Sequence, residues 1–148
     1  MSVPAAADTT PIESRSQLVA HLESGAKPRS AWRIGTEHEK FAFDAKTLRR
    51  LPYEGPHGIK ALLEGFFRYG WEPIREGETL IGAVKGKAAI SLEPGGQLEL
   101  SGAPLESIHQ TCDEVHTHLA EAKAICTEIG AGLLGLGFDP KWRRDDVP

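Results

Sequence analysis

The sequence has few cysteines and no excess of basic residues, and both shortages exclude classes of protein. Its 148 residues include two cysteines, and 21 aspartates and glutamates outnumber 17 lysines and arginines, so the formal net charge is −4. Nucleic acid is a poor candidate partner, because phosphate binding needs a basic surface. Two cysteines are also too few for the disulfide framework of a small secreted domain.

Long hydrophobic segments are also absent from the sequence. No apolar run approaches the ~20 residues that cross a bilayer, so we expect no membrane contact. The first eight residues, MSVPAAAD, have neither the basic start nor the apolar centre of a secretory signal peptide. From these two absences we expect a cytoplasmic protein.

The two cysteines, Cys112 and Cys126, fall within one predicted helix. Fourteen residues of helix span about 21 Å, whereas a disulfide needs Cα atoms within about 7 Å of each other. We therefore expect two free thiols, with Cys126 buried or half-buried.

What the sequence does contain is ordinary for a globular domain: 40% hydrophobic and 26% charged residues. Residues 1–11 are small, polar and proline-containing, which predicts a disordered N-terminus. Hydrophobic periodicity and turn residues predict helices at 12–24, 58–69 and about 104–129, and strands at 31–44, about 71–76, 79–84, 87–93, 97–101 and 133–138. Adjacent strands with flanking helices predict an α+β fold with a mainly antiparallel sheet.

Four glutamates on two of these strand segments are the most informative feature of the chain. Glu37 and Glu39 lie two residues apart, so they share a strand face with Cα atoms about 6.8 Å apart. A Pro-Gly-Gly turn separates Glu93 from Glu99. If that turn closes a hairpin, Glu93 lies opposite Gln97, and both glutamates lie on one polar face.

Such a group of carboxylates needs compensation, because each pair at 4 Å costs about 1 kcal/mol in water and about 4 kcal/mol at an effective dielectric of 20. Hard divalent cations such as Mg²⁺ supply it most directly. Two plainer interpretations stay open: the glutamates line a solvated strand face, or Arg33, predicted on the face of Glu37 and Glu39, pairs with them.

The remaining candidate residues give weaker signals. His38 alternates to the face opposite its flanking glutamates, which favours a packing role. The spacing of the histidines at 109, 116 and 118 is not typical of a zinc site. The segment Trp142-Arg143-Arg144 is suited to an anionic ligand, because arginine matches phosphates and carboxylates, or to salt bridges with the two aspartates that follow.

Three runs of this sequence, RIGTEHEKF (33–41), SLEPGGQLELSGAPLE (91–106) and HQTC (109–112), closely resemble glutamate–cysteine ligase of the type found in plants and many proteobacteria. The run GFDPKWRR (137–144) is similar to a further landmark of that family, so the resemblance covers about residues 12–148. It implies a partial catalytic domain like that of glutamine synthetase, in which a curved antiparallel sheet holds Mg²⁺–ATP on its concave side.

The resemblance also implies the chemistry. The family uses ATP to join the γ-carboxylate of L-glutamate to the amine of L-cysteine through a γ-glutamyl phosphate, the first step of glutathione synthesis. The implied Mg²⁺ ligands are Glu37, Glu39, Glu93 and Glu99, and the implied contacts to cofactor are Gln97, Arg143 and Arg144. In plant members a cysteine at the position of Cys112 is associated with a regulatory disulfide, whose partner is not in this chain.

Full-length members of that family are much longer, so residues 12–148 resemble only the N-terminal portion of their catalytic domain. We therefore expect this chain by itself to be inactive. Two other interpretations stay open: a different carboxylate–amine ligase of the same superfamily, and an inactive metal- or nucleotide-binding fragment.

Overall fold

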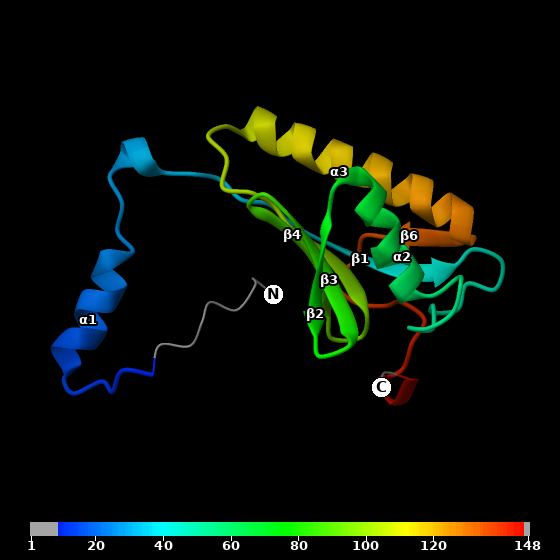
Figure 1. Cartoon of the computed structure of the whole chain (residues 1–148), viewed down its shortest axis with the longest axis horizontal. Coiled ribbons are helices and arrows are strands. Elements are labelled where there is room, and N and C mark those ends of the chain that lie inside the picture. Colours follow the sequence, from blue (N-terminus) through cyan, green and yellow to red (C-terminus); the bar gives the residue numbers. More distant parts are fainter. Residues whose placement is uncertain (1–8, 147–148) are drawn as a thin grey trace.

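The computed structural model describes residues 9–146, which form an α+β fold built on one six-stranded antiparallel sheet (Figure 1). The strand order is β2-β3-β4-β5-β1-β6. The strands are β1 (Glu37–Asp44), β2 (Glu72–Glu76), β3 (Thr79–Lys85), β4 (Ala88–Glu93), β5 (Gln97–Ser101) and β6 (Ala131–Leu134). The helices are α1 (Arg15–Ser24), α2 (Ile59–Gly65) and α3 (Ile108–Ile129), with 3₁₀ turns η1 (Arg29–Ala31), η2 (Phe66–Tyr69) and η3 (Arg144–Asp146).

Helices α2 and α3 pack against the same face of the sheet, and the core lies between them and the strands (Figure 1). The alternation of the β4–β5 hairpin explains why this face is apolar, since every second side chain points to the helices. The fully buried side chains of this core include Ile90, Leu98 and Leu100 from the strands and Leu62, Leu63 and Ile125 from the helices. The helix layer therefore leaves the polar side chains of the same strands on the other face.

The Pro-Gly-Gly turn closes the β4–β5 hairpin as predicted. Gly95 and Gly96 both adopt positive φ (82° and 80°), which glycine accepts without the steric cost of a side chain. The strands then pair with Glu93 opposite Gln97. The predicted strands around this hairpin agree with β2 to β5 to within about one residue at each end.

The long helix α3 begins later than predicted. Pro104 was expected to open it, but the helix starts at Ile108 after a capping box in which Ser107 accepts a hydrogen bond from the Gln110 amide and Gln110 reaches back. Reciprocal capping satisfies two orphan backbone donors, so it sets the start more strongly than proline does. Ile108 and Cys112 are exposed, and the buried positions of the helix are Thr111, His118, Ala122, Ile125 and Cys126.

Two predicted strands were too long. The strand expected at 31–44 begins at Glu37, because residues 29–31 form η1 and Ile34 makes only an isolated bridge to Leu105. The strand expected at 133–138 is β6, which begins at Ala131 and ends at Leu134. Alternation of apolar residues alone did not reveal where pairing with a neighbouring strand stops.

The N-terminal part of the described chain stands away from the sheet (Figure 1). Helix α1 is capped by Ser14 and followed by Gly25, but none of its residues is buried. Its apolar residues Leu18, Val19 and Leu22 are exposed. The prediction of disorder for residues 1–11 falls mainly on residues outside the described range.

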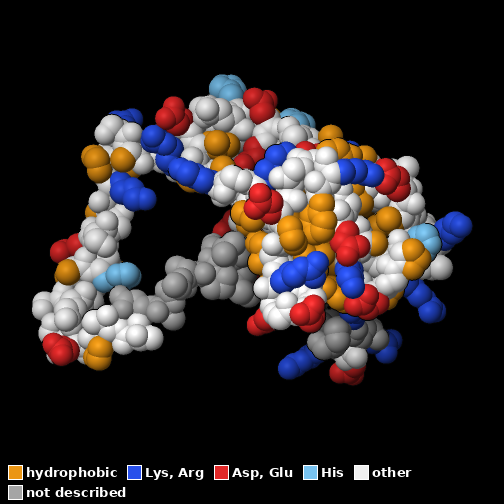
Figure 2. Space-filling model, in the orientation of Figure 1, with side chains coloured by type: hydrophobic (Ala, Val, Ile, Leu, Met, Phe, Trp, Pro, Cys, Tyr) orange, Lys and Arg blue, Asp and Glu red, His pale blue; other side chains and the backbone are white. Residues whose placement is uncertain are grey.

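The surface of the described residues is mixed in character. In the view of Figure 2, basic and acidic side chains are interspersed over the sheet and helices, with hydrophobic side chains scattered among them. No helix within residues 9–146 is both long and apolar enough to cross a membrane.

His118 is a buried histidine that the sequence pattern did not distinguish from its exposed neighbours. Its ring stacks on Phe66 with 5.6 Å between ring centroids and 1° between planes. Neither of its ring nitrogens has a hydrogen-bond partner within the described residues. Burial, with smaller contributions from Lys40 and His38, lowers the pKa of His118 to about 3.

This burial predicts a specific acid sensitivity. Above about pH 6.5 His118 is neutral in both folded and unfolded states, whereas below that pH only the unfolded state binds the proton. The free energy of unfolding should therefore fall as the pH drops from 6.5 toward 3. Between pH 7 and pH 5, urea unfolding should show a loss about 2 kcal/mol smaller for His118→Leu than for the wild type. The exposed His109→Leu variant is the control, and parallel pH profiles for all three proteins would contradict the prediction.

Candidate functional site

The pairing register brings the four predicted glutamates onto one face of three adjacent strands. Residues directly opposite one another in an antiparallel pair share a face. Glu39 of β1 lies opposite Glu99 of β5, and Glu93 of β4 lies opposite Gln97 of β5. Glu37 lies opposite Ser101, two positions along the same strand face. We call this set the acidic face: Glu37, Glu39, Glu93 and Glu99 with Ser91, Gln97 and Ser101.

Polar side chains between the glutamates organise the acidic face. The Gln97 amide Nε2 donates to Glu39 Oε2 at 3.2 Å and to the Leu136 carbonyl at 3.3 Å. The Ser101 hydroxyl donates to Glu99 Oε1 at 2.9 Å, and the Ser91 hydroxyl lies 3.5 Å from Glu99 Oε2. Glu99 is thus the best-anchored carboxylate of the set, at the centre of the three strands.

The environments of the four carboxylates differ. Glu99 is buried, Glu93 is half-buried, and Glu37 and Glu39 are exposed. Burial raises the pKa of Glu99, but hydrogen bonding at its carboxylate, including the bond from the Ser101 hydroxyl, lowers it, and the net direction is downward. Glu99 therefore carries its negative charge at neutral pH.

A shared face does not by itself make a metal cage. Within residues 9–146 no three histidine, cysteine, aspartate or glutamate side chains are grouped closely enough to hold a metal ion. The donors on the acidic face are nevertheless carboxylate, hydroxyl and amide oxygens, which suit hard cations. Mg²⁺ keeps several waters and takes only one or two carboxylates together with substrate phosphates. The donor set therefore fits Mg²⁺ bound with a phosphate ligand better than an all-protein site.

Arg33 does not neutralise the acidic face. Its guanidinium donates to Glu106 Oε1 at 3.1 Å and to the backbone carbonyls of Ser30 and Trp32. The alternative in which Arg33 pairs with Glu37 and Glu39 is therefore wrong, because Arg33 precedes the strand and turns toward the loop before α3.

A buried lysine lies directly behind the acidic face. Lys40 points to the helix layer, where its Nζ donates to the His38 carbonyl at 2.7 Å and lies 3.0 Å from His38 Nδ1. Burial lowers the pKa of Lys40 to about 8, opposed by the negative charges of Glu99 and Glu39. His38 faces the same layer, as predicted, and burial followed by the Lys40 charge lowers its pKa. Sequence reasoning missed Lys40, although its alternation onto an apolar strand face was a visible signal.

The C-terminal segment packs at one end of the acidic face. Trp142 contacts Phe41 edge-on, with 5.8 Å between ring centroids, and the Arg50 guanidinium lies over the Trp142 ring at 5.0 Å. Phe41 lies opposite Gln97, so this aromatic contact borders the glutamates. Trp142 and Arg50 also line a cavity of about 220 Å³ together with Glu93, Gly95 and Gly96.

The structure places Arg50 beside Trp142, in addition to the predicted Arg143 and Arg144, which follow Trp142 in the chain. Arg50, which sequence reasoning missed, is brought beside Trp142 by the loop after β1. Arg143 and Arg144 are exposed and adjoin Trp142 in the chain. Asp139 orients this segment, since its Oδ1 accepts hydrogen bonds from the backbone amides of Lys141 and Trp142.

Both cysteines are free, as predicted. Cys112 is exposed, and its Sγ lies 3.4 Å from His116 Nδ1. Cys126 is buried, and burial raises its pKa to about 11, which leaves it a poorly reactive thiol at neutral pH.

Comparison with known proteins supports the resemblance on which these residues were chosen. Residues 33–148 match the family model described as glutamate-cysteine ligase family 2 (GCS2). The chain is 54% identical over 141 residues to the chloroplastic glutamate–cysteine ligases of Brassica juncea and Arabidopsis thaliana, and 52% identical to that of Medicago truncatula. These matches cover 95% of this chain but only 26–27% of the relatives' length.

The names of these relatives overturn one prediction. They are chloroplastic proteins, so the expectation of a cytoplasmic protein is wrong. The reasoning failed because lacking a secretory signal excludes one destination only, and chloroplast targeting relies on a different kind of segment.

The match to the family model spans both glutamate-bearing strand segments, the long helix and the Trp142 segment. The predicted resemblance is therefore confirmed, and the chain belongs to glutamate-cysteine ligase family 2.

Proposed function

We propose that this chain is the part of an ATP-dependent ligase that binds Mg²⁺ and the ATP phosphates through its acidic face. The reaction proposed for the complete enzyme joins the γ-carboxylate of L-glutamate to the amine of L-cysteine. ATP transfers its γ-phosphoryl group to the γ-carboxylate of glutamate, and the cysteine amine then displaces phosphate. The relatives are named glutamate–cysteine ligases, which supports the joining of these two amino acids.

The observation that carries the proposal is the register of β4, β5 and β1. The register places Glu39 of β1 directly opposite Glu99 of β5. It also places Glu93 of β4 on the same face, opposite Gln97. Aligned carboxylates repel, so a fold that holds them together gains stability when a cation joins them. Such stabilisation by a cation is expected of a metal site that is completed only when Mg²⁺ binds together with the nucleotide.

The residues of the acidic face would take different parts in this site. Glu93 and Glu99 come from the two strands of one tight hairpin, and are the ligands we assign first to Mg²⁺. Glu39 is oriented by Gln97 Nε2, so it is suited to a second metal contact or to a metal-bound water. Bound Mg²⁺ would offset the negative charge of the phosphates during phosphoryl transfer.

The basic and aromatic residues at the end of the acidic face suit the rest of the nucleotide. Arg50 and Trp142 stack on one another beside the Gly95–Gly96 turn, where the missing side chains allow close approach of a ligand. We assign Arg143 and Arg144 to contacts with anionic groups, since both are exposed next to Trp142. We assign no residue of this chain to the recognition of the substrates L-cysteine and L-glutamate.

The first test uses the complete ligase that carries this chain, with Glu93→Gln and Glu99→Gln made separately. Each change keeps the shape of the side chain but removes a negative charge from the metal site. We expect cysteine-dependent ADP formation to fall on the order of 100-fold, the scale of losing one electrostatic contact to the transition state. Excess Mg²⁺ should restore little of the activity.

Glu64→Gln is the matched control, because Glu64 is exposed on α2 in the helix layer. Its activity should equal that of the wild type. Full activity of both Glu93→Gln and Glu99→Gln would remove the hairpin from the metal site. ATP turnover that depends on another amine instead of cysteine would assign the chain to a different carboxylate–amine ligase.

A second prediction tests the repulsion itself in the 148-residue chain. Glu39 faces Glu99 directly, whereas Glu37 faces Ser101. Without divalent ions, Glu39→Gln should raise the free energy of unfolding by about 0.5 kcal/mol, because it removes a pair of like charges on opposed strands. Glu37→Gln should change it less.

Mg²⁺ at millimolar concentration should reverse the order, by stabilising the wild type more than Glu39→Gln. Urea unfolding followed by circular dichroism, with EDTA and then with Mg²⁺, measures both effects. Equal responses of the wild type and both variants to Mg²⁺ would argue against a cation site on this face.

A further inference from the structure

A second cavity lies on the opposite side of the sheet from the acidic face. It has a volume of about 460 Å³, is open to solvent on one side, and is bordered by β1, β6 and the second half of α3. Volumes of this size are typical of pockets for small organic ligands. Its lining residues are His38, Lys40, Leu119, Lys123, Cys126, Thr127, Ala131, Gly132, Leu133 and Gly135.

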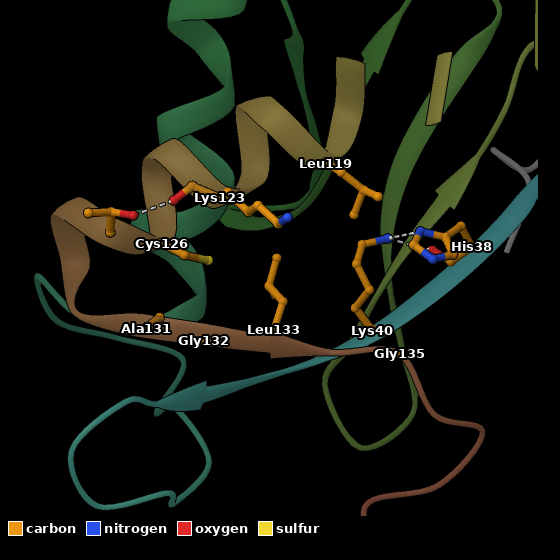
Figure 3. Close-up of a pocket in the computed structure, with 10 residues that line it drawn as sticks. His38, Lys40, Leu119, Lys123, Cys126, Ala131, Gly132, Leu133 and Gly135 are labelled. Atoms are coloured by element: carbon orange, nitrogen blue, oxygen red, sulfur yellow. Dashed lines mark hydrogen bonds between the residues drawn. The ribbon is translucent and has the colours of Figure 1, made fainter. Parts of the chain in front are cut away.

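The charged side chains of this cavity are all basic. Figure 3 shows Lys123 extending from α3 across the space toward β1, and Lys40 rising from β1 on the far side with its amino group turned to His38. No aspartate or glutamate belongs to the lining residues. Both lysines nevertheless line the same cavity, and an anion lying between them would form attractive contacts with both ammonium groups.

The hydrogen bonds of Lys40 fix its amino group at the border of the cavity. Lys40 Nζ donates to the His38 carbonyl and meets His38 Nδ1 at 3.0 Å. An ammonium has only hydrogens to offer, so Nδ1 must be the acceptor and the His38 proton must lie on Nε2. Two of the three N–H groups of Lys40 are thus directed at His38, and the third, with those of Lys123, remains for a ligand that carries acceptor oxygens.

The rest of the lining is apolar. Leu119 from α3 and Leu133 and Ala131 from β6 form the wall beside the lysines (Figure 3). A bare inorganic anion would leave most of this wall uncovered. An organic anion would place its charged head between the lysines and its carbon skeleton against the leucines.

We propose that the cavity between α3 and the β1–β6 strands is a binding site for a small organic anion, with a phosphate or carboxylate head held by Lys40 and Lys123. Because the sheet separates it from the acidic face, this site is independent of the proposed Mg²⁺–ATP site. Its ligand would bind without Mg²⁺.

Calorimetric titration of the 148-residue chain in EDTA tests the proposal, with phenyl phosphate, benzoate, inorganic phosphate and phenol as probes. We expect saturable binding of phenyl phosphate or benzoate, weaker binding of inorganic phosphate, and none of phenol. The comparison of phenyl phosphate with benzoate identifies the preferred head group. Absence of saturable binding of every anion would overturn the proposal.

Three lysine variants locate the site. Lys123→Gln should weaken binding of the preferred probe about tenfold, through loss of one charge-assisted contact, whereas Lys123→Arg should retain it within a factor of about three. Lys87→Gln, at the exposed turn between β3 and β4, makes the same change in net charge and should have no effect. Equal weakening by Lys123→Gln and Lys87→Gln would indicate only a general charge effect and would overturn the proposal.

Amide NMR shifts give a readout that does not depend on affinity. The preferred probe should shift the amides of Thr127, Gly132 and Leu133, which line the cavity. Shifts confined to Gly95, Gly96 and Trp142 would place the anion at the end of the acidic face instead, and would refute this site while leaving the proposed function intact.

Discussion

The alignment of β1 with β5 is the constraint on which the rest of the structure depends. A shift of one residue in this pairing would turn every side chain of β1 to the other face. Glu39 would then enter the core, and Lys40 would join the glutamates. The observed register instead buries Leu98 and Leu100 beneath the helices. Burial of these leucines contributes about 1.5–3 kcal/mol per side chain, so packing of the apolar face specifies the position of the acidic one.

The two faces of the sheet are consequently opposite in chemistry as well as in packing. One face gathers carboxylates, whose mutual repulsion a cation relieves. The other places Lys40 under α3, behind Glu39 and Glu99, whose negative charges partly offset the lowering of the Lys40 pKa by burial. A buried lysine is costly to maintain, and in this fold its carbonyl and imidazole partners from His38 compensate for part of that cost. The same strand therefore serves two separate candidate sites.

Membership of glutamate-cysteine ligase family 2 gives the acidic face its chemical interpretation, although the chain spans only about a quarter of its relatives' length. Metal and phosphate chemistry needs oxygen ligands held at fixed relative positions, and in the proposed site the hairpin and its neighbouring strand would hold them. The side chains do not form a cage by themselves. This is consistent with a cation that is shared between the protein and a phosphate ligand.

Local features of the sequence determined much of the fold. The Pro-Gly-Gly turn, the alternation of Glu93, Gln97 and Glu99, and the amphipathic pattern of α2 predicted the hairpin, its polar face and the helix, because each depends on residues close together in the chain. What only the tertiary structure decided was which distant residues meet. Arg33 turned to Glu106 and not to the glutamates, Arg50 came to lie on Trp142, and His118 and Lys40 became buried, because these outcomes depend on how separate strands and helices pack and no local pattern encodes that.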